Sequence, residues 1–494
     1  MPTHVEEVQP VVAGKGRDPT LPPNHPINAF SPMRKMGIVL SLAYAGCLAN
    51  FAIAICNVSF GWVTDRVLAD NSEVGKSLGV GPGDIANALG YNLLGCGVGS
   101  LFWNPLSRSW GRRPVYLIGS FLFMPVCVWE ALSKNYACFV VARIMAGIVT
   151  SWSQTIPPSS IAEIYVPQMR GSKMSIFGVA VVIGPVIVPI FAAAIVEHHS
   201  WRNLFWFNLG LAALQFLLIL FFVPETMWNW EENTDIVEVD DKKDTVVEHK
   251  RSGYVGPAFL PHTDWKRFWP LCWSPIYMIH YIVITVPSFY YGICLGFLSV
   301  APTVIFPQIF GKPPYSFAVV PLGCAFLGFG VGGVLGKWSG GHVSDMIVAY
   351  MERKHGRRIP EDRLWAGIPL LPLMFIGQLL CGVCVQYELH WMCFIVGAAI
   401  NFFALSGITT VILTYVLETY ISKGMDTQAV FNFWKYLWGF AVPFFTMKWG
   451  ETRGWMACFC GMGAVLTGFG ALMIAGLIWK GHAIRKWQNM PMED

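Results

Sequence analysis

The stretch NLFWFNLGLAALQFLLILFFV, residues 203–223, contains 21 residues and no charged side chain. About 20 apolar residues in a helix cross the hydrocarbon core of a bilayer, so this stretch predicts a membrane-spanning helix. The whole chain has a similar character. Of its 494 residues 54% are hydrophobic and 13% are charged, whereas about 25% are charged in an ordinary soluble domain. The bilayer is therefore the expected solvent of this protein.

Eleven further stretches have a similar length and composition. The sequence lacks the alternating segments of about ten residues that predict membrane β-strands. We therefore predict an all-α integral membrane protein with twelve transmembrane helices. The predicted spans are residues 37–57, 85–103, 115–133, 137–158, 174–195, 203–223, 281–305, 317–336, 366–386, 392–415, 428–446 and 455–479.

Most Lys and Arg residues fall in every second segment between these spans. Cytoplasmic loops carry the excess of basic residues, so both termini are predicted to be cytoplasmic. The stretch from Pro275 to Phe306 is long for one crossing. Two crossings there would put the basic segment 353–363 outside the cell. We therefore predict one span, preceded by an interfacial helix.

A charged stretch between Pro224 and Lys266 separates two sets of six spans. Gly-Arg-Arg follows the second span at residues 111–113 and the eighth span at residues 356–358, which is the same loop of each set. Two six-helix halves are typical of secondary transporters, whose substrate site lies near the midplane between them. The predicted units are a cytoplasmic tail (1–35), an N-terminal six-helix bundle (36–224), a cytoplasmic loop (225–268), a C-terminal six-helix bundle (269–479) and a cytoplasmic tail (480–494).

Residues 104–114, Asn-Pro-Leu-Ser-Arg-Ser-Trp-Gly-Arg-Arg-Pro, resemble the Gly-x-Leu-x-Asp-Arg-x-Gly-Arg-Arg signature of the major facilitator superfamily. Asn104 replaces the usual first Gly, and Arg108 replaces the usual acidic residue. The second half keeps both features in Gly341 and Asp345. The resemblance implies two pseudo-repeat bundles that open alternately to the two faces of the membrane.

Two further motifs resemble one subgroup of that superfamily, the fungal drug:proton antiporters with twelve spans. Arg143 and Gly147 match its Arg-x-x-x-Gly motif, and Gly184-Pro185 lies in the setting of its antiporter motif. The resemblance implies export of a small amphipathic compound, a drug or secondary metabolite, in exchange for protons at the plasma membrane. A carrier of carboxylates or sugar-like solutes, with Arg143 binding an anion, is the alternative, followed by an integral membrane enzyme.

Arg143 lies within a predicted span, where a cation costs about 2.5 to 3.5 kcal/mol and requires a partner. Glu130 is the candidate, because both residues lie at a similar distance from the turn between the third and fourth spans. One hypothesis is a proton-sensitive pair, in which protonation of Glu130 frees Arg143. The other is a permanent structural pair near the outer headgroups.

Uncharged polar residues in the spans are further candidates for substrate binding, although hydrogen bonds between helices explain many such residues. Lys435 is interpreted as an anchor whose long side chain reaches the cytoplasmic interface. The predicted substrate-binding residues are Asn50, Arg143, Gln154, Tyr290, Tyr291 and Asn401.

Charged residues at the cytoplasmic ends of the spans are predicted to lock the two halves together when that side is closed. The alternative for Arg112 and Arg113 is the positive-inside signal alone. The predicted gate and conformational residues are Gly111, Arg112, Arg113, Glu163, Arg170, Gly184, Pro185 and Asp345.

We expect no metal and no cofactor, since His198-His199 has no third ligand nearby and the sequence has no Walker motif. The spacing Gly332-x-x-x-Gly336 predicts helix packing. Asn57 begins a glycosylation sequon that abuts a span. The expected partners are a small-molecule substrate, protons and the lipid bilayer, without nucleic acid, and the protein is expected to be a monomer.

Overall fold

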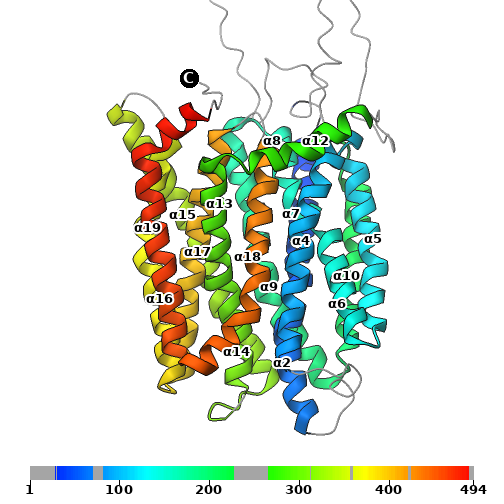
Figure 1. The fold of residues 1–494 in the computed structure, drawn as a ribbon. Helices are drawn as coiled ribbons and strands as arrows, with labels where there is room; N and C mark the ends of the chain where they lie inside the picture. The colour runs from blue at the N-terminus through cyan, green and yellow to red at the C-terminus, as the bar shows by residue number, and fades with distance from the viewer. Residues whose placement is uncertain are drawn as a thin grey trace, which may run out of the picture.

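The computed structural model describes residues 28, 30–69, 82–226, 265–311, 313–355, 360–420 and 424–488. Within these ranges every regular element is a helix, and the long helices run side by side in one bundle (Figure 1). The N-terminal half contains α2 (Pro32–Ala69), α4 (Pro82–Trp110), α5 (Arg112–Leu132), α6 (Tyr136–Thr150), α7 (Trp152–Thr155), α8 (Pro157–Ile164), α9 (Pro167–His198) and α10 (Arg202–Phe222). The C-terminal half contains α12 (Trp265–Met278), α13 (Ile282–Leu295), η1 (Gly296–Val300), α14 (Ala301–Phe310), α15 (Val319–His355), η2 (Pro360–Gly367), α16 (Leu370–Gln386), α17 (Trp391–Thr419), α18 (Gly424–Arg453) and α19 (Trp455–Trp487).

The twelve predicted spans correspond to twelve helical rods. Ten described stretches are long and apolar enough to cross a membrane. The other two rods are α4 and α18, with 29 and 30 residues, which run through the bundle beside them (Figure 1). The prediction of an all-α membrane fold is thus confirmed. The central segment predicted as a loop lies largely outside the described residues, as does the side chain of Asn57.

The structure corrects the end of the eighth span. Helix α15 continues to His355, well beyond the predicted end at residue 336. Lys337, which the prediction leaves in a loop, is therefore at the midpoint of this helix. No charged residue follows Lys337 before Asp345, and one charge does not end a helix.

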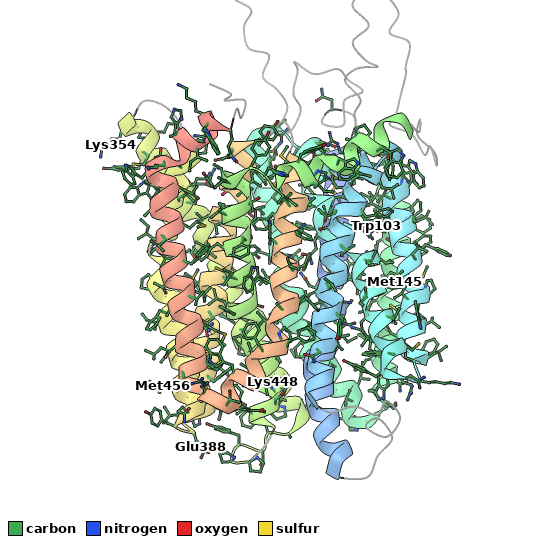
Figure 2. All side chains as sticks on the ribbon, viewed as in Figure 1. Trp103, Met145, Lys354, Glu388, Lys448 and Met456 are labelled. Carbon is green, nitrogen blue, oxygen red and sulfur yellow. The ribbon has the colours of Figure 1, made fainter. Side chains whose placement is uncertain are left out.

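The prediction of an interfacial helix before the seventh span is confirmed. Helix α12 lies across one end of the bundle (Figure 1), and the stretch from Ile282 to Phe310 forms one apolar crossing. We call the end of the bundle that carries α8 and α12 the α12 edge. Lys354 lies at this edge, whereas Glu388 and Lys448 lie at the opposite edge (Figure 2).

Both described ends of the chain lie at the α12 edge. The ammonium group of Lys35, at the start of α2, lies 5.6 Å from the ring centre of Tyr165, which follows α8. The carboxyl-terminal end of α19, the last described helix, lies at the same edge in Figure 1. An even number of crossings accounts for this arrangement.

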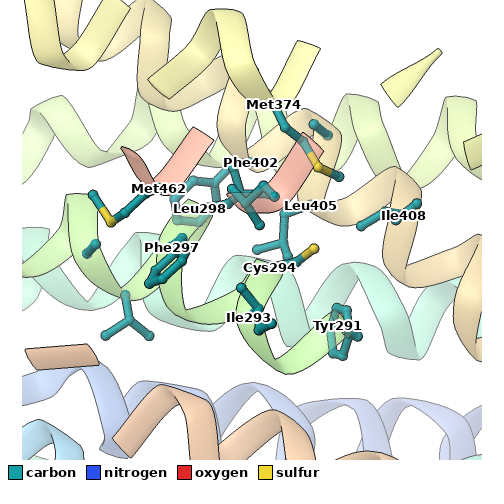
Figure 3. Close-up of a cluster of buried hydrophobic side chains, with 14 of the residues drawn as sticks. Tyr291, Ile293, Cys294, Phe297, Leu298, Met374, Phe402, Leu405, Ile408 and Met462 are labelled. Atoms are coloured by element: carbon teal, nitrogen blue, oxygen red, sulfur yellow. The ribbon is translucent and has the colours of Figure 1, made fainter. Parts of the chain in front are cut away.

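Small residues let helices approach closely within the C-terminal half. A Cβ atom added at Gly332 or Gly336 of α15 would overlap the backbone of Ala399 or Phe403 in α17. The packing interpretation of this glycine spacing is confirmed. Apolar side chains fill the rest of this half, and Figure 3 shows part of that core, including Phe297.

The two halves meet along two pairs of helices, α4 with α18 and α9 with α15. Gly90 of α4 faces the backbone of Phe440 in α18, and Gly323 of α15 faces the backbone of Pro189 in α9. Close backbone approach at both seams brings side chains of the two halves within hydrogen-bonding distance.

Candidate functional site

Three polar side chains connect the two halves in the bundle interior. Gln154 of α7 donates a hydrogen bond to Asn50 of α2 (Nε2–Oδ1 2.6 Å) and accepts one from Lys435 of α18 (Nζ–Oε1 2.7 Å). Asn50 and Gln154 are predicted substrate-binding residues, and the structure brings them together with Lys435. We call these three residues the polar bridge.

The structure corrects the interpretation of Lys435 as an interfacial anchor. Lys435 lies about 16 Å along α18 from its first residue, at about 1.5 Å per residue. Its ammonium group contacts Gln154 and lies 4.5 Å from the ring centre of Tyr436, which is 1% exposed. A polar partner inside the bundle removes the need for this side chain to reach the interface.

The Gly184-Pro185 pair of α9 positions Asn50. Pro185 has no N–H group, so the carbonyl of Val181, four residues earlier, lacks its usual helical donor. The side-chain amide of Asn50 donates to that carbonyl (Nδ2–O 2.9 Å). Gly184 permits the contact, because a Cβ atom there would lie 2.5 Å from the carbonyl oxygen of Cys47 in α2 and 3.2 Å from the Cβ of Asn50.

A second lysine lies near the polar bridge. The Cε of Lys337 in α15 lies 2.9 Å from the position that a Cβ atom would take at Gly178 of α9. Gly178 precedes Val181 by three residues, so the two lie on the same face of α9. Sequence analysis missed Lys337 because its span was predicted to end one residue before it.

A further hydrogen bond between α18 and α7 supports the polar bridge. The amide of Asn432 in α18 donates to the hydroxyl of Thr155 in α7 (Nδ2–Oγ1 3.2 Å). Asn432 precedes Lys435 by three residues, so two side chains on one face of α18 contact α7. This double contact fixes the register of α18 against α7.

The predicted pair of Arg143 and Glu130 is present and is fully buried. Their side chains have no exposed surface, and Nη1 of Arg143 lies 3.0 Å from Oε1 of Glu130. Arg143 also donates to the carbonyls of Ala52 and Ile53 in α2 (3.0 and 3.2 Å). Glu130 belongs to α5 and Arg143 to α6, so the pair joins three helices within the N-terminal half.

The remaining predicted binding residues lie in different surroundings. Tyr290 donates to the carbonyl of Leu466 (3.1 Å) inside the C-terminal half, and Asn401 packs between α16 and α17 with its amide 3.7 Å from the sulfur of Cys381. Tyr291 instead stacks on Phe431 of α18, with ring centres 4.6 Å apart. Of these three residues, Tyr291 contacts the helix that carries Lys435.

Four of the predicted gate residues form a network within the N-terminal half. Gly111 precedes α5 with φ 95°, a conformation that favours glycine. Arg112 forms an ion pair with Glu163 and donates to Ser160 (2.9 Å). The backbone N–H of Arg113 donates to Glu225 (3.0 Å). These contacts join the α12-edge ends of α5, α8 and α10.

The ion pairs of the predicted gate residues lie within one half, although Nη2 of Arg112 also lies 3.6 Å from the sulfur of Met425 in α18. That these charges lock the two halves together stays a prediction. Arg170 donates to the carbonyl of Tyr165 in its own half (3.0 Å). Asp345 pairs with Arg363 of the C-terminal half (3.0 Å), and Arg363 also binds Glu418 (2.7 Å). Glu163 and Asp345 each pair with a cation of their own half, because the helix ends of one half lie next to one another at this edge.

A different ion pair joins the halves at the α12 edge. Arg108 of α4 lies 3.0 Å from Asp426 of α18, whose side chain has no exposed surface. Asn104 and Ser274 also donate to Asp426 (2.9 and 2.6 Å). Sequence analysis did not select Asp426. The available signal was an acidic residue two positions before a predicted span, and in the structure it lies in the first turn of α18, where the helix dipole favours it.

The sequence matches the family model of the Major Facilitator Superfamily over residues 42–443. The chain belongs to this superfamily. It is 21% identical to the MFS antiporter QDR3 of Candida albicans, over 78% of this chain and 71% of that protein. It is 26% identical to fluconazole resistance protein 1 of Saccharomyces cerevisiae, over 67% of this chain and 60% of that protein.

Solved structures agree on the fold. The xylose transporter XylE of E. coli is 16% identical, with a TM-score of 0.62 over 93% of this chain and 98% of that one. The human organic anion transporter MFSD10 is 18% identical, with a TM-score of 0.58 over 90% and 100%. At these identities the likeness shows the fold alone.

Asn104 and Arg108, the two residues that depart from the superfamily signature, have a physical explanation in this chain. Asn104 and Arg108 both bind Asp426. An acidic residue at position 108 would repel that carboxylate, whereas arginine neutralises it. The contact between α4 and the start of α18 therefore depends on a basic residue at position 108 in this transporter.

Proposed function

We propose that this multi-pass membrane transporter exports a small amphipathic organic compound, a drug or secondary metabolite, by alternating access with proton antiport. The named relatives support this proposal, since they include an MFS antiporter and a protein of fluconazole resistance. The observation that carries the proposal is the polar bridge. It joins side chains of both halves in the interior, where secondary transporters bind their substrates.

The bridge suits a site that opens and closes. Lys435 belongs to one half, and Asn50 and Gln154 belong to the other, so the halves cannot separate around this point without breaking the Lys435 bond. A substrate with polar groups replaces that bond when it binds. Binding energy is thus coupled to the movement of one half against the other.

Glu130 and Arg143 are the proposed proton-coupling residues. A protonated Glu130 loses its charge attraction to Arg143, while Arg143 keeps its bonds to the carbonyls of Ala52 and Ile53. Protonation therefore weakens the link from α5 to α6 and leaves the link to α2. One oxygen of Glu130, Oε2, accepts no hydrogen bond from any described residue and is available for the proton.

We further propose that the α12 edge faces the cytoplasm, that the protein is a monomer and that the membrane is the plasma membrane. The clustering of Lys and Arg near this edge supports the orientation. The predicted limits of the two bundles, 36–224 and 269–479, with the cytoplasmic loop 225–268 between them, are part of the same proposal.

The test is flux in vesicles that contain the purified protein. A panel of fluorescent amphipathic compounds is followed while a proton gradient is imposed. We expect movement of at least one compound against its gradient, and loss of that movement when an uncoupler is added. Gln154→Leu should lower this flux at least tenfold, whereas Asn203→Leu, at an exposed position of α10, should leave it within twofold. Flux that ignores the proton gradient would rule out antiport.

A further inference from the structure

We propose that the transported compound is an amphipathic organic anion, and that Lys337 and Lys435 together bind its carboxylate group. This inference rests on the proposed transport function and specifies its substrate class. It replaces Arg143, the anion-binding candidate of the sequence analysis, with two residues that lie where the halves meet.

Among the described residues, the two lysines lack a matching negative charge in the interior between the halves. Two fully buried carboxylates already have cations as partners. Glu130 pairs with Arg143, and Asp426 pairs with Arg108. Within the described part of the chain, no carboxylate forms an ion pair with either lysine. The region between the halves therefore carries an excess of positive charge.

The two lysines lie on either side of the polar bridge. Lys337 packs against Gly178, one helical turn from the Val181 carbonyl that binds Asn50. On the other side of Asn50, Gln154 links it to Lys435. The two lysines thus approach the polar bridge from different helices, Lys337 beside α9 and Lys435 through Gln154.

Both lysine side chains are partly accessible. Lys337 and Lys435 are at or near the middle of their helices, yet neither side chain is fully buried. Each lysine therefore keeps some surface that a ligand between the halves can reach.

A carboxylate is the ligand that this arrangement favours. Two like charges in a medium of low dielectric constant repel one another, and each is costly without a counter-ion. The two oxygens of a carboxylate can accept one charge-assisted hydrogen bond from each ammonium group. An amphipathic cation would instead add a third positive charge to the site.

Aromatic rings beside the lysines suit an aryl or similar apolar body. Phe431 precedes Lys435 by four residues on the same face of α18 and stacks on Tyr291. Trp434 packs edge-on against Phe289, with ring centres 5.2 Å apart. Its indole N–H is buried and has no hydrogen-bond acceptor among the described residues. Apolar walls with a few fixed polar groups are typical of small-molecule sites.

The experiment measures binding to the purified full-length protein in detergent, where no transport is needed. The probes are phenylbutyrate, naphthylacetate and pyrenebutyrate, each with its primary amide and with the amine of the same aromatic body. Stabilisation against thermal unfolding reports binding, because a ligand of the folded state raises the unfolding temperature. We expect at least one carboxylate to bind at least tenfold more tightly than its amide and its amine.

Variants then assign the charge preference to the two lysines. Lys337→Gln and Lys435→Gln should each lower carboxylate affinity at least tenfold and bring it within threefold of amide affinity. Lys337→Arg should retain most of the preference. Lys448→Gln, at an exposed position of the same helix as Lys435, is the matched control and should change nothing.

Each outcome bears on the inference. Tighter binding of the amines, equal binding of all three classes, no binding of any carboxylate, or unchanged carboxylate preference in both lysine variants would overturn it. The proposed function fails separately, if vesicles show no proton-dependent flux of any compound. Carboxylate binding without flux would leave an anion site in a protein that is not an antiporter.

Discussion

Arg108 of α4 and Asp426 of α18 form an ion pair of 3.0 Å that joins the two halves at the α12 edge. Two neutral donors, Asn104 and Ser274, complete the shell of this buried carboxylate. Opening of the α12 edge must break or rearrange these bonds. We therefore propose that this ion pair acts as a latch, that is, a contact that must break when the α12 edge opens.

Weakening the latch should favour opening at this edge. Asp426→Asn removes the charge, and removal of one partner from a buried charged hydrogen bond costs about 1 to 3 kcal/mol. We expect faster hydrogen–deuterium exchange in the first turns of α18, measured by mass spectrometry. Glu451→Gln, an exposed change on the same helix, should leave that exchange unaltered. Equal exchange in both variants would show that Asp426 does not hold the edge closed.

The pair of Glu130 and Arg143 should connect stability with proton coupling. Arg143→Ala leaves Glu130 as a buried charge without its partner, and we expect a loss of about 3 to 5 kcal/mol in unfolding free energy. Adding Glu130→Gln to that variant should restore part of the loss.

Glu130→Gln alone should still permit exchange of labelled for unlabelled substrate. It should abolish the response of flux to an imposed proton gradient, because position 130 can no longer take up a proton. Gradient-driven flux at the normal rate in this variant would remove Glu130 from the coupling mechanism.

Variants at Asn50 and Pro185 can separate an effect on thermal stability from an effect on transport. Asn50→Leu leaves the Val181 carbonyl without its donor, and an unsatisfied buried polar group costs about 1 to 3 kcal/mol. Pro185→Ala restores a backbone N–H that can bind the same carbonyl. The double variant should therefore recover thermal stability relative to Asn50→Leu but remain defective in transport. Recovery of transport would mean that Asn50 serves only the helix.

The close contact of α15 with α17 should be sensitive to one methyl group. Gly332→Ala would push against the backbone of Ala399, and overpacking of this kind costs about 1 to 3 kcal/mol. Gly341→Ala on the same helix meets no atom within 4 Å, so it should be neutral or slightly stabilising. Unfolding temperatures of the two variants provide the comparison, and equal values would contradict the packing role of Gly332.

Contacts between neighbouring spans could be predicted from sequence, and contacts between the halves could not. Glu130 and Arg143 flank one hairpin, so counting residues from its turn sufficed to pair them. Arg108 and Asp426 are more than 300 residues apart, and only the packing of α4 on α18 brings them together. No local pattern carries that information.

The predictions for Lys337, placed in a loop, and Lys435, interpreted as an anchor, were wrong for a second reason. A charged residue in an apolar stretch is ambiguous, since it marks a span end, an anchor or a buried site. The sequence rules for membrane proteins favour the first two interpretations. Here Gly178 makes room for one lysine and Gln154 binds the other, and neither partner is near its lysine in the sequence.

Reciprocal opening of the two edges is the central claim, and spin-label distances test it most directly. One label pair is placed at Met169 and Lys354 at the α12 edge, and the other at Lys134 and Glu388 at the opposite edge, all at exposed positions. Pulsed electron resonance on the protein in lipid, at two pH values and with a transported compound, should show one distance lengthening as the other shortens. Two distances that stay fixed, or that lengthen together, under conditions that support flux would contradict alternating access.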